Sequence, residues 1–212
     1  MEFIKYTVDL FLHIDKNLVL VIAKYGTLTY GLLFFVIFME TGLVVTPFLP
    51  GDSLLFAAGA LAAMGSLNIV LLWVLMALAA VIGDTANYWI GHRFGRGVFE
   101  KKSKFFKKEY LEEAEAFYAK HGGKAIILAR FVPIVRTFAP FVAGISEMHY
   151  GKFISYNIIG GLSWVSLFLL GGFWFGNIPF VKENFHYVVI AIILISIVPI
   201  IWAAVKKGKK KG

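Results

Sequence analysis

The chain has 212 residues, of which 59% are hydrophobic and 16% charged, and its formal net charge is +8. A soluble domain carries more charged residues, so the composition predicts one integral membrane domain over residues 1–212. The sequence contains no cysteine, which excludes thiol nucleophiles, disulfides and cysteine-ligated metals. The basic residues lie beside apolar segments, so membrane topology explains them better than a nucleic-acid partner does.

The N-terminal segment, residues 1–25, lacks the basic start and cleavage site of a signal peptide. We expect it to belong to the mature protein, where it either crosses the membrane or lies on the outer surface.

The first broken apolar segment covers residues 31–59 and carries Glu40 and Asp52 near its middle. Three helix-breaking residues lie between its two halves: Pro47, Pro50 and Gly51. Hydrocarbon penalises ions and unpaired backbone groups, so such a segment persists only where it lines a cavity or packs against protein. We therefore predict a re-entrant helical hairpin.

Two interpretations of Glu40 stay open, because it follows ten uncharged residues, 30–39. It forms a structural ion pair with an arginine of a second hairpin, or it takes up and releases protons; intramembrane acids are functional by default. Asp52 precedes an apolar run and fits a helix N-cap. It is equally a candidate for a functional acid, because a cap inside the bilayer also marks the end of a half-helix that faces the cavity.

A long apolar segment at residues 67–90 is predicted to cross the membrane and to end at a basic loop. Asp84 lies roughly two turns from its inner end, where it pairs with a hairpin arginine or reaches interfacial water. Tyr88 is expected to be a supporting residue in the packing or the aromatic belt.

The basic loop, residues 93–124, holds nine Lys/Arg against five Asp/Glu, and the tail at 206–212 holds five lysines. Both are predicted to be cytoplasmic by the positive-inside rule. Within the loop, residues 108–121 have apolar side chains at helical spacing, which predicts an amphipathic helix on the cytoplasmic surface. A protein-binding helix is the alternative.

The apolar segment 125–144 is predicted to enter and leave on the cytoplasmic side. The last crossing, 187–205, ends at the cytoplasmic tail, so the preceding crossing, 153–175, must start from the cytoplasm. A segment with both ends on one side is a re-entrant hairpin, with its turn expected near residues 133–136. Two prolines are predicted to break it: Pro133 and Pro140.

Arg130 and Arg136 flank this second break and are six residues apart, so a bend allows them to converge. A guanidinium group binds phosphate or carboxylate oxygens through a fork of N–H donors and stays charged. Anion binding is therefore the favoured interpretation. The alternative is that both side chains extend to the cytoplasmic headgroups.

The two halves, residues 1–95 and 96–177, repeat one plan of a hairpin followed by a crossing. Each crossing ends in small-residue spacing that permits close helix packing: Gly91-x-x-x-Gly95 and Gly172-x-x-x-Gly176. Hairpins entering from opposite faces form an inverted repeat, as in many secondary transporters. The predicted fold is all-α, with two opposed re-entrant hairpins, about three full transmembrane helices and amphipathic surface helices.

Catalytic machinery is not visible in the sequence. The five histidines do not have metal-site spacing, and there is no nucleophile elbow, phosphate-binding glycine loop or zinc-binding helix motif. We expect no metal, no cofactor and no enzyme activity.

The charged motifs resemble the DedA family of bacterial membrane proteins, within the VTT or SNARE-associated superfamily. The resemblance covers roughly residues 26–176. It depends on three stretches: Glu40-Thr-Gly with Phe48-Leu-Pro-Gly-Asp52, Gly83-Asp84 with Tyr88, Gly91 and Gly95, and Arg130-Phe-Val-Pro-Ile-Val-Arg136 with Pro140 and Gly144.

This resemblance implies a multi-pass protein of the bacterial inner membrane that moves lipids, notably undecaprenyl phosphate, to the cytoplasmic face. It also implies that Glu40 and Asp52 form the acidic pair and that Arg130 and Arg136 are the essential arginines. Other family members are linked to phospholipid flipping and to proton-dependent drug or alkaline tolerance.

The leading hypothesis is a transporter of lipid phosphate, in which Arg130 and Arg136 bind the phosphate. Protons taken up by Glu40 and Asp52, or the membrane potential, would drive it. Four alternatives stay open: a proton-coupled exporter of cationic drugs, a phosphatidylethanolamine flippase or scramblase, an enzyme acting on lipid phosphate, and a membrane scaffold. A homo-oligomer is compatible with each of them.

Overall fold

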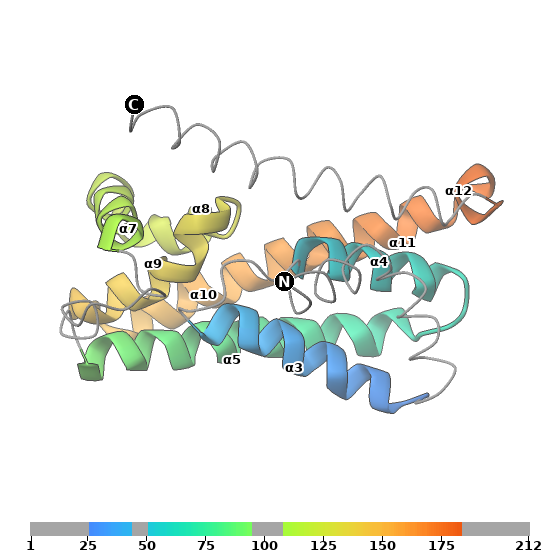
Figure 1. Cartoon of the computed structure of the whole chain (residues 1–212), viewed down its shortest axis with the longest axis horizontal. Coiled ribbons are helices and arrows are strands. Elements are labelled where there is room, and N and C mark those ends of the chain that lie inside the picture. Colours follow the sequence, from blue (N-terminus) through green and yellow to red (C-terminus); the bar gives the residue numbers. More distant parts are fainter. Residues whose placement is uncertain (1–25, 44–50, 95–107, 184–212) are drawn as a thin grey trace, which may run out of the picture. The chain divides into compact units, whose positions relative to one another are not determined.

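The computed structural model describes residues 26–43, 51–94 and 108–183, and every regular element in these ranges is helical (Figure 1). The α-helices are α3 (Leu28–Gly42), α4 (Gly51–Ala63), α5 (Ile69–Phe94), α7 (Lys108–His121), α8 (Ala125–Ala129), α9 (Pro133–Ile145), α10 (Tyr150–Val165), α11 (Gly171–Gly176) and α12 (Pro179–Glu183). The all-α prediction is confirmed for this part of the chain. The predictions for residues 1–25, Pro47, Pro50, 187–205 and 206–212 lie outside the described ranges.

Within the described ranges, two helices are long and apolar enough to cross a membrane. They are α5, with 26 residues, and the continuous helix Tyr150–Gly176, with 27 residues, which joins α10 and α11 through a π-helical turn at Ser166–Leu170. At 1.5 Å per residue each is about 39–40 Å long, which exceeds the roughly 30 Å of hydrocarbon. These helices correspond to the predicted crossings 67–90 and 153–175.

The second predicted hairpin consists of two short helices, α8 and α9, which contact each other. The chain bends at Arg130–Val132, slightly before the predicted turn at 133–136. Pro133 is the first residue of α9, where its missing N–H donor costs nothing. Pro140 does not break the hairpin as predicted, because α9 continues through it and loses only one helical hydrogen bond.

The chain forms two compact units. The described part of the first comprises residues 26–29, 51–69 and 168–183, and in it α4 packs against α11. Gly172 lies against the backbone of Phe56, and Gly59 lies against the backbone of Leu169; a Cβ at either glycine would collide with that backbone. A Cβ at Gly176 would likewise collide with Ala60, so the predicted spacing of Gly172 and Gly176 does support close helix packing here.

The described part of the second unit comprises residues 30–43, 70–94 and 108–167, and in it α5 meets α9 through the same arrangement. Gly91 lies against the backbone of Phe141, and Gly144 lies against the backbone of Tyr88. The spacing is the same in both units. Phe56 and Leu169 lie three positions before Gly59 and Gly172, and Tyr88 and Phe141 lie three positions before Gly91 and Gly144. The predicted halves thus exchange helices, since α4 packs with a helix of 96–177 and α9 with a helix of 1–95.

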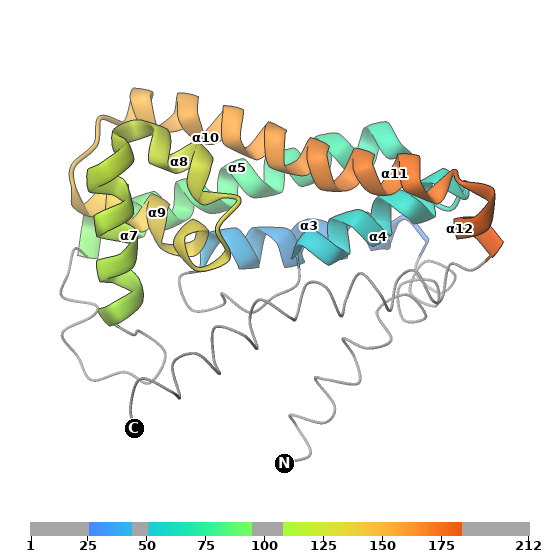
Figure 2. The ribbon, with the colours of Figure 1, turned by 90° about the horizontal axis from the view of Figure 1, so that it is seen from above.

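The amphipathic helix predicted at 108–121 is α7, which contacts α8 and α9 (Figure 2). Ala114 is buried on its inner side, whereas Glu112 and Glu113 are exposed. The core beneath it contains large side chains of α9 and α10: Phe138, Phe141, Val142 and Phe153. This core fixes α9, and with it the residues described next.

Candidate functional site

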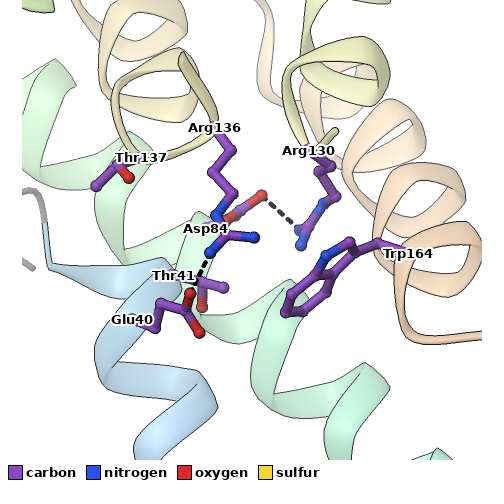
Figure 3. Close-up of a pocket in the computed structure, with 7 residues that line it drawn as sticks. All are labelled: Glu40, Thr41, Asp84, Arg130, Arg136, Thr137 and Trp164. Carbon is purple, nitrogen blue, oxygen red and sulfur yellow. Dashed lines mark hydrogen bonds and ion pairs between the residues drawn. The ribbon is translucent and has the colours of Figure 1, made fainter. Parts of the chain in front are cut away.

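A charged pocket lies inside the second unit, where α3, α5, α9 and α10 meet the turn between α8 and α9 (Figure 3). Seven residues line it: Glu40, Thr41, Asp84, Arg130, Arg136, Thr137 and Trp164. Its cavity volume is about 10 Å³, close to the least that a single water molecule requires. Four of the predicted site residues therefore converge in one nearly closed pocket.

Arg130 is the more deeply buried of the two arginines, with 5% of its surface exposed. Its Nη2 donates to Asp84 Oδ2 at 2.5 Å, to Asn157 Oδ1 at 2.7 Å and to the Ala80 carbonyl at 3.3 Å. A buried charge is tolerated only when it is paired and hydrogen-bonded. Of the two interpretations of Asp84, pairing with a hairpin arginine is confirmed.

Asn157 and two glycines of α10 form the slot that holds Arg130. Asn157 is fully buried, and its Nδ2 donates to the Val81 carbonyl at 2.9 Å, so its Oδ1 is turned toward the guanidinium. A Cβ at Gly160 would come within 3.4 Å of Arg130 Cδ, and one at Gly161 within 3.5 Å of Nη2. Both distances are ordinary van der Waals contact, so the glycines lie beside Arg130 while its hydrogen bonds to Asp84 and Asn157 hold it in place.

Arg136 lies in the first turn of α9 and pairs with Glu40, near the end of α3, through its Nη2. The Arg136 side chain is 13% exposed, whereas that of Glu40 is 3% exposed. The structural ion pair proposed for Glu40 is therefore present. Proton exchange at Glu40 stays a prediction, and the two interpretations are compatible.

Trp164 closes the pocket from α10. Its indole ring lies beside both guanidinium groups, with the Cζ of Arg136 at 5.5 Å and the Cζ of Arg130 at 5.8 Å from the ring centroid (Figure 3). Both distances are within the range of cation–π interactions.

A buried amide connects the elements around the pocket. Asn87 donates through Nδ2 to the carbonyl of Thr41 at 3.2 Å and to the carbonyl of Thr137 at 2.8 Å. These bonds tie α5 to the ends of α3 and α9 that carry Glu40 and Arg136. Close approach of the helices is aided by Gly42, where an added Cβ would be 3.3 Å from the Cα of Gly83.

Two residues that were predicted to belong to the site do not line the pocket. Tyr88 is buried, stacks on Phe153 at a centroid distance of 4.4 Å and donates its hydroxyl to the carbonyl of Met148, so its role is packing. Asp52 belongs to the first unit, and its pairing with Glu40 stays a prediction. It is the second residue of α4 rather than its N-cap, because the helix begins at Gly51; a carboxylate there still favours the helix dipole.

Sequence reasoning missed Trp164 and Asn157 as members of the site. One signal for each was present. Asn157 is an amide within an apolar crossing, and Trp164 lies well inside the same crossing instead of at an interface, where tryptophan is enriched. Neither residue is charged, so neither stood out against its neighbours.

The sequence is similar to a known domain and to known membrane proteins. The VTT domain matches residues 49–174. The chain is 54% identical to Protein DedA of Escherichia coli (strain K12) over 202 residues, which cover 94% of this chain and 92% of that protein. It is 32% identical to the Inner membrane protein YghB of Escherichia coli (strain K12), with 81% of this chain and 78% of that protein covered.

A third relative, the Inner membrane protein YqjA of the same strain, is 33% identical over 71% of this chain and 69% of that protein. No solved structure matches significantly. The VTT domain, the extent of identity to Protein DedA and the long apolar helices together show that the chain belongs to the DedA family of membrane proteins.

Proposed function

We propose that this protein moves an anionic phosphate lipid, undecaprenyl phosphate or a related phospholipid, across the cytoplasmic membrane. The observation that carries the proposal is the Arg136–Glu40 pair, which borders a pocket between apolar helices and leaves Arg136 partly exposed. Membrane location follows from the family, and the Inner membrane protein YghB supports the cytoplasmic membrane as the site. A cytoplasmic position of loop 93–124 and of the tail is part of the proposal.

Glu40 and a lipid phosphate would compete for the same guanidinium. Carboxylate and phosphate oxygens accept the same forked N–H donors, so Arg136 binds one or the other at full strength. Protonation of Glu40 removes its negative charge and weakens its bond to Arg136. The phosphate then takes its place, which couples lipid binding to proton uptake.

Arg130 would contribute a fixed positive charge to the pocket while Arg136 exchanges Glu40 for the phosphate. It is held by Asp84 and Asn157, so it stays in place while Arg136 changes partner. The cavity is too small for a headgroup when both pairs are closed, so binding requires side chains around Arg136 to move. The lipid tail can remain in the bilayer, and only the headgroup needs to enter.

The test is transport of labelled undecaprenyl phosphate in liposomes that contain the purified protein, with an imposed pH gradient. Arg136→Ala and Arg136→Lys should each lose most of the transport, because lysine keeps the charge but not the fork. Glu40→Gln should transport without responding to the gradient. The matched control is Arg93→Ala, which removes an exposed arginine at the end of α5 and should leave transport unchanged.

The same liposomes decide between the remaining candidates. Phosphatidylethanolamine and a cationic dye are supplied in separate arms, and released inorganic phosphate is measured. If the protein transports the dye, and the Arg136→Lys variant transports it equally well, drug export replaces this proposal. Released phosphate would indicate an enzyme, and unchanged transport in both Arg136→Ala and Glu40→Gln would exclude the exchange mechanism.

A further inference from the structure

We propose that Trp164 is the positioning residue of the charged pocket: its indole face holds both guanidinium groups and keeps Arg136 in the pocket when Glu40 releases it. The contacts themselves are independent of what is transported. Their consequence for phosphate binding rests on the proposed function above.

The geometry places one aromatic face against two cations. The Cζ atoms of Arg136 and Arg130 lie 5.5 and 5.8 Å from the Trp164 ring centroid, and Trp164 is 1% exposed. The face of an indole carries negative potential, and its attraction for a cation grows when both are removed from water. Trp164 therefore offsets part of the repulsion between two neighbouring positive charges.

The contact to the ring face does not use the N–H donors of the guanidinium. Arg136 donates to Glu40 through Nη2 while its Cζ lies over the indole. Loss of the Glu40 charge removes the ion pair but leaves the ring contact. Arg136 then presents its donors to the pocket instead of extending toward water or headgroups, as a long cationic side chain otherwise does.

A purely structural role for Trp164 predicts something different. A large buried residue also fills space, and Trp164→Leu would lose stability for that reason alone. Fluorination separates the two roles, because successive fluorine atoms on the indole weaken its negative face with little change in shape. A cation–π contact weakens stepwise along such a series, whereas packing does not.

The experiment introduces tryptophan, monofluoro-, difluoro- and tetrafluorotryptophan at position 164 of the full chain by codon suppression. The matched control is the same series at Trp73, a half-buried residue of the same unit whose Nε1 donates to Ser166 Oγ at 2.9 Å. Each variant is measured for transport of undecaprenyl phosphate in liposomes. Its thermal midpoint in detergent is measured with Glu40 intact and with Glu40→Gln.

At position 164 the apparent KM should rise stepwise, by about tenfold across the series, while the maximal rate changes little. The thermal midpoint should fall stepwise, and more steeply with Glu40→Gln, where the ring contact carries a larger share of the hold on Arg136. The Trp73 series should be flat in both readouts. A flat series at 164, or equal slopes at 164 and 73, would overturn the proposal.

Failure of the proposed function gives a separate result. If the unmodified protein moves no phosphate lipid, lipid-phosphate transport is wrong, and the thermal series alone decides the role of Trp164. A stepwise fall at 164 that steepens with Glu40→Gln supports positioning of Arg136 by the indole. A thermal series without that steepening overturns it.

Discussion

Replacing Asp84 by asparagine removes one charge from the deeper ion pair and leaves nearly the same volume. Arg130 then remains 5% exposed and charged, with the Asn157 Oδ1 and the Ala80 carbonyl as its remaining acceptors. Removing one member of a buried ion pair costs about 3–5 kcal/mol. Because two acceptors remain, we expect a loss of about 3 kcal/mol in the free energy of unfolding.

Glu40→Gln is the matched comparison, since it makes the same kind of change in the second pair. The Arg136 side chain is 13% exposed, so its guanidinium can recover some hydration after the carboxylate is lost. We expect a smaller cost, about 1 kcal/mol, between the values for surface and buried pairs. The order of the two costs is the essential prediction.

Reversible unfolding in mixed micelles at pH 7, followed by tryptophan fluorescence, measures both free energies. The double variant Asp84→Asn with Arg130→Met should recover part of the loss, because it leaves no unpaired charge in the interior. If Asp84→Asn costs no more than Glu40→Gln, Arg130 is not the fixed member of the site. Purely additive losses in the double variant would lead to the same conclusion.

Three further changes are measured by the same unfolding assay. Gly172→Ala should cost about 1–3 kcal/mol, because its Cβ meets the backbone of Phe56, whereas Gly171→Ala has open space and should be neutral or stabilising. Asn87→Leu should cost about 2 kcal/mol, because two buried carbonyls lose their donor. A smaller loss than that of an asparagine-to-leucine change at an exposed position would show that water replaces the Asn87 amide as the donor. Tyr88→Phe should cost about 1 kcal/mol with transport retained, and loss of transport would give Tyr88 more than a packing role.

Periodicity and charge predicted the helices well because these patterns are local. The bounds of α7 and the approximate limits of α5 follow from apolar spacing and from the basic loop between them. The position of the hairpin turn was less accurate, because proline was taken as its apex. In the structure Pro133 starts the second helix, and the residues before it make the bend.

The pairing of charges was beyond the reach of the sequence. Glu40 and Asp84 were both candidates to pair with either of two arginines, and nothing local decides which pairs with which. Glu40 and Arg136 are 96 positions apart, and their contact depends on how α3 and α9 meet around Asn87. The same dependence on packing concealed Trp164, whose importance comes from the two cations that the fold places beside it.

The charges around the pocket have a consequence for the membrane as a whole. Two carboxylates and two guanidiniums neutralise each other, so the closed pocket has no net charge with which to draw chloride or free phosphate from solution. Its cavity has space for about one water molecule, which is too little for a hydrated ion to pass through this pocket. A membrane can therefore hold many copies of this protein without the closed pocket itself conducting hydrated ions.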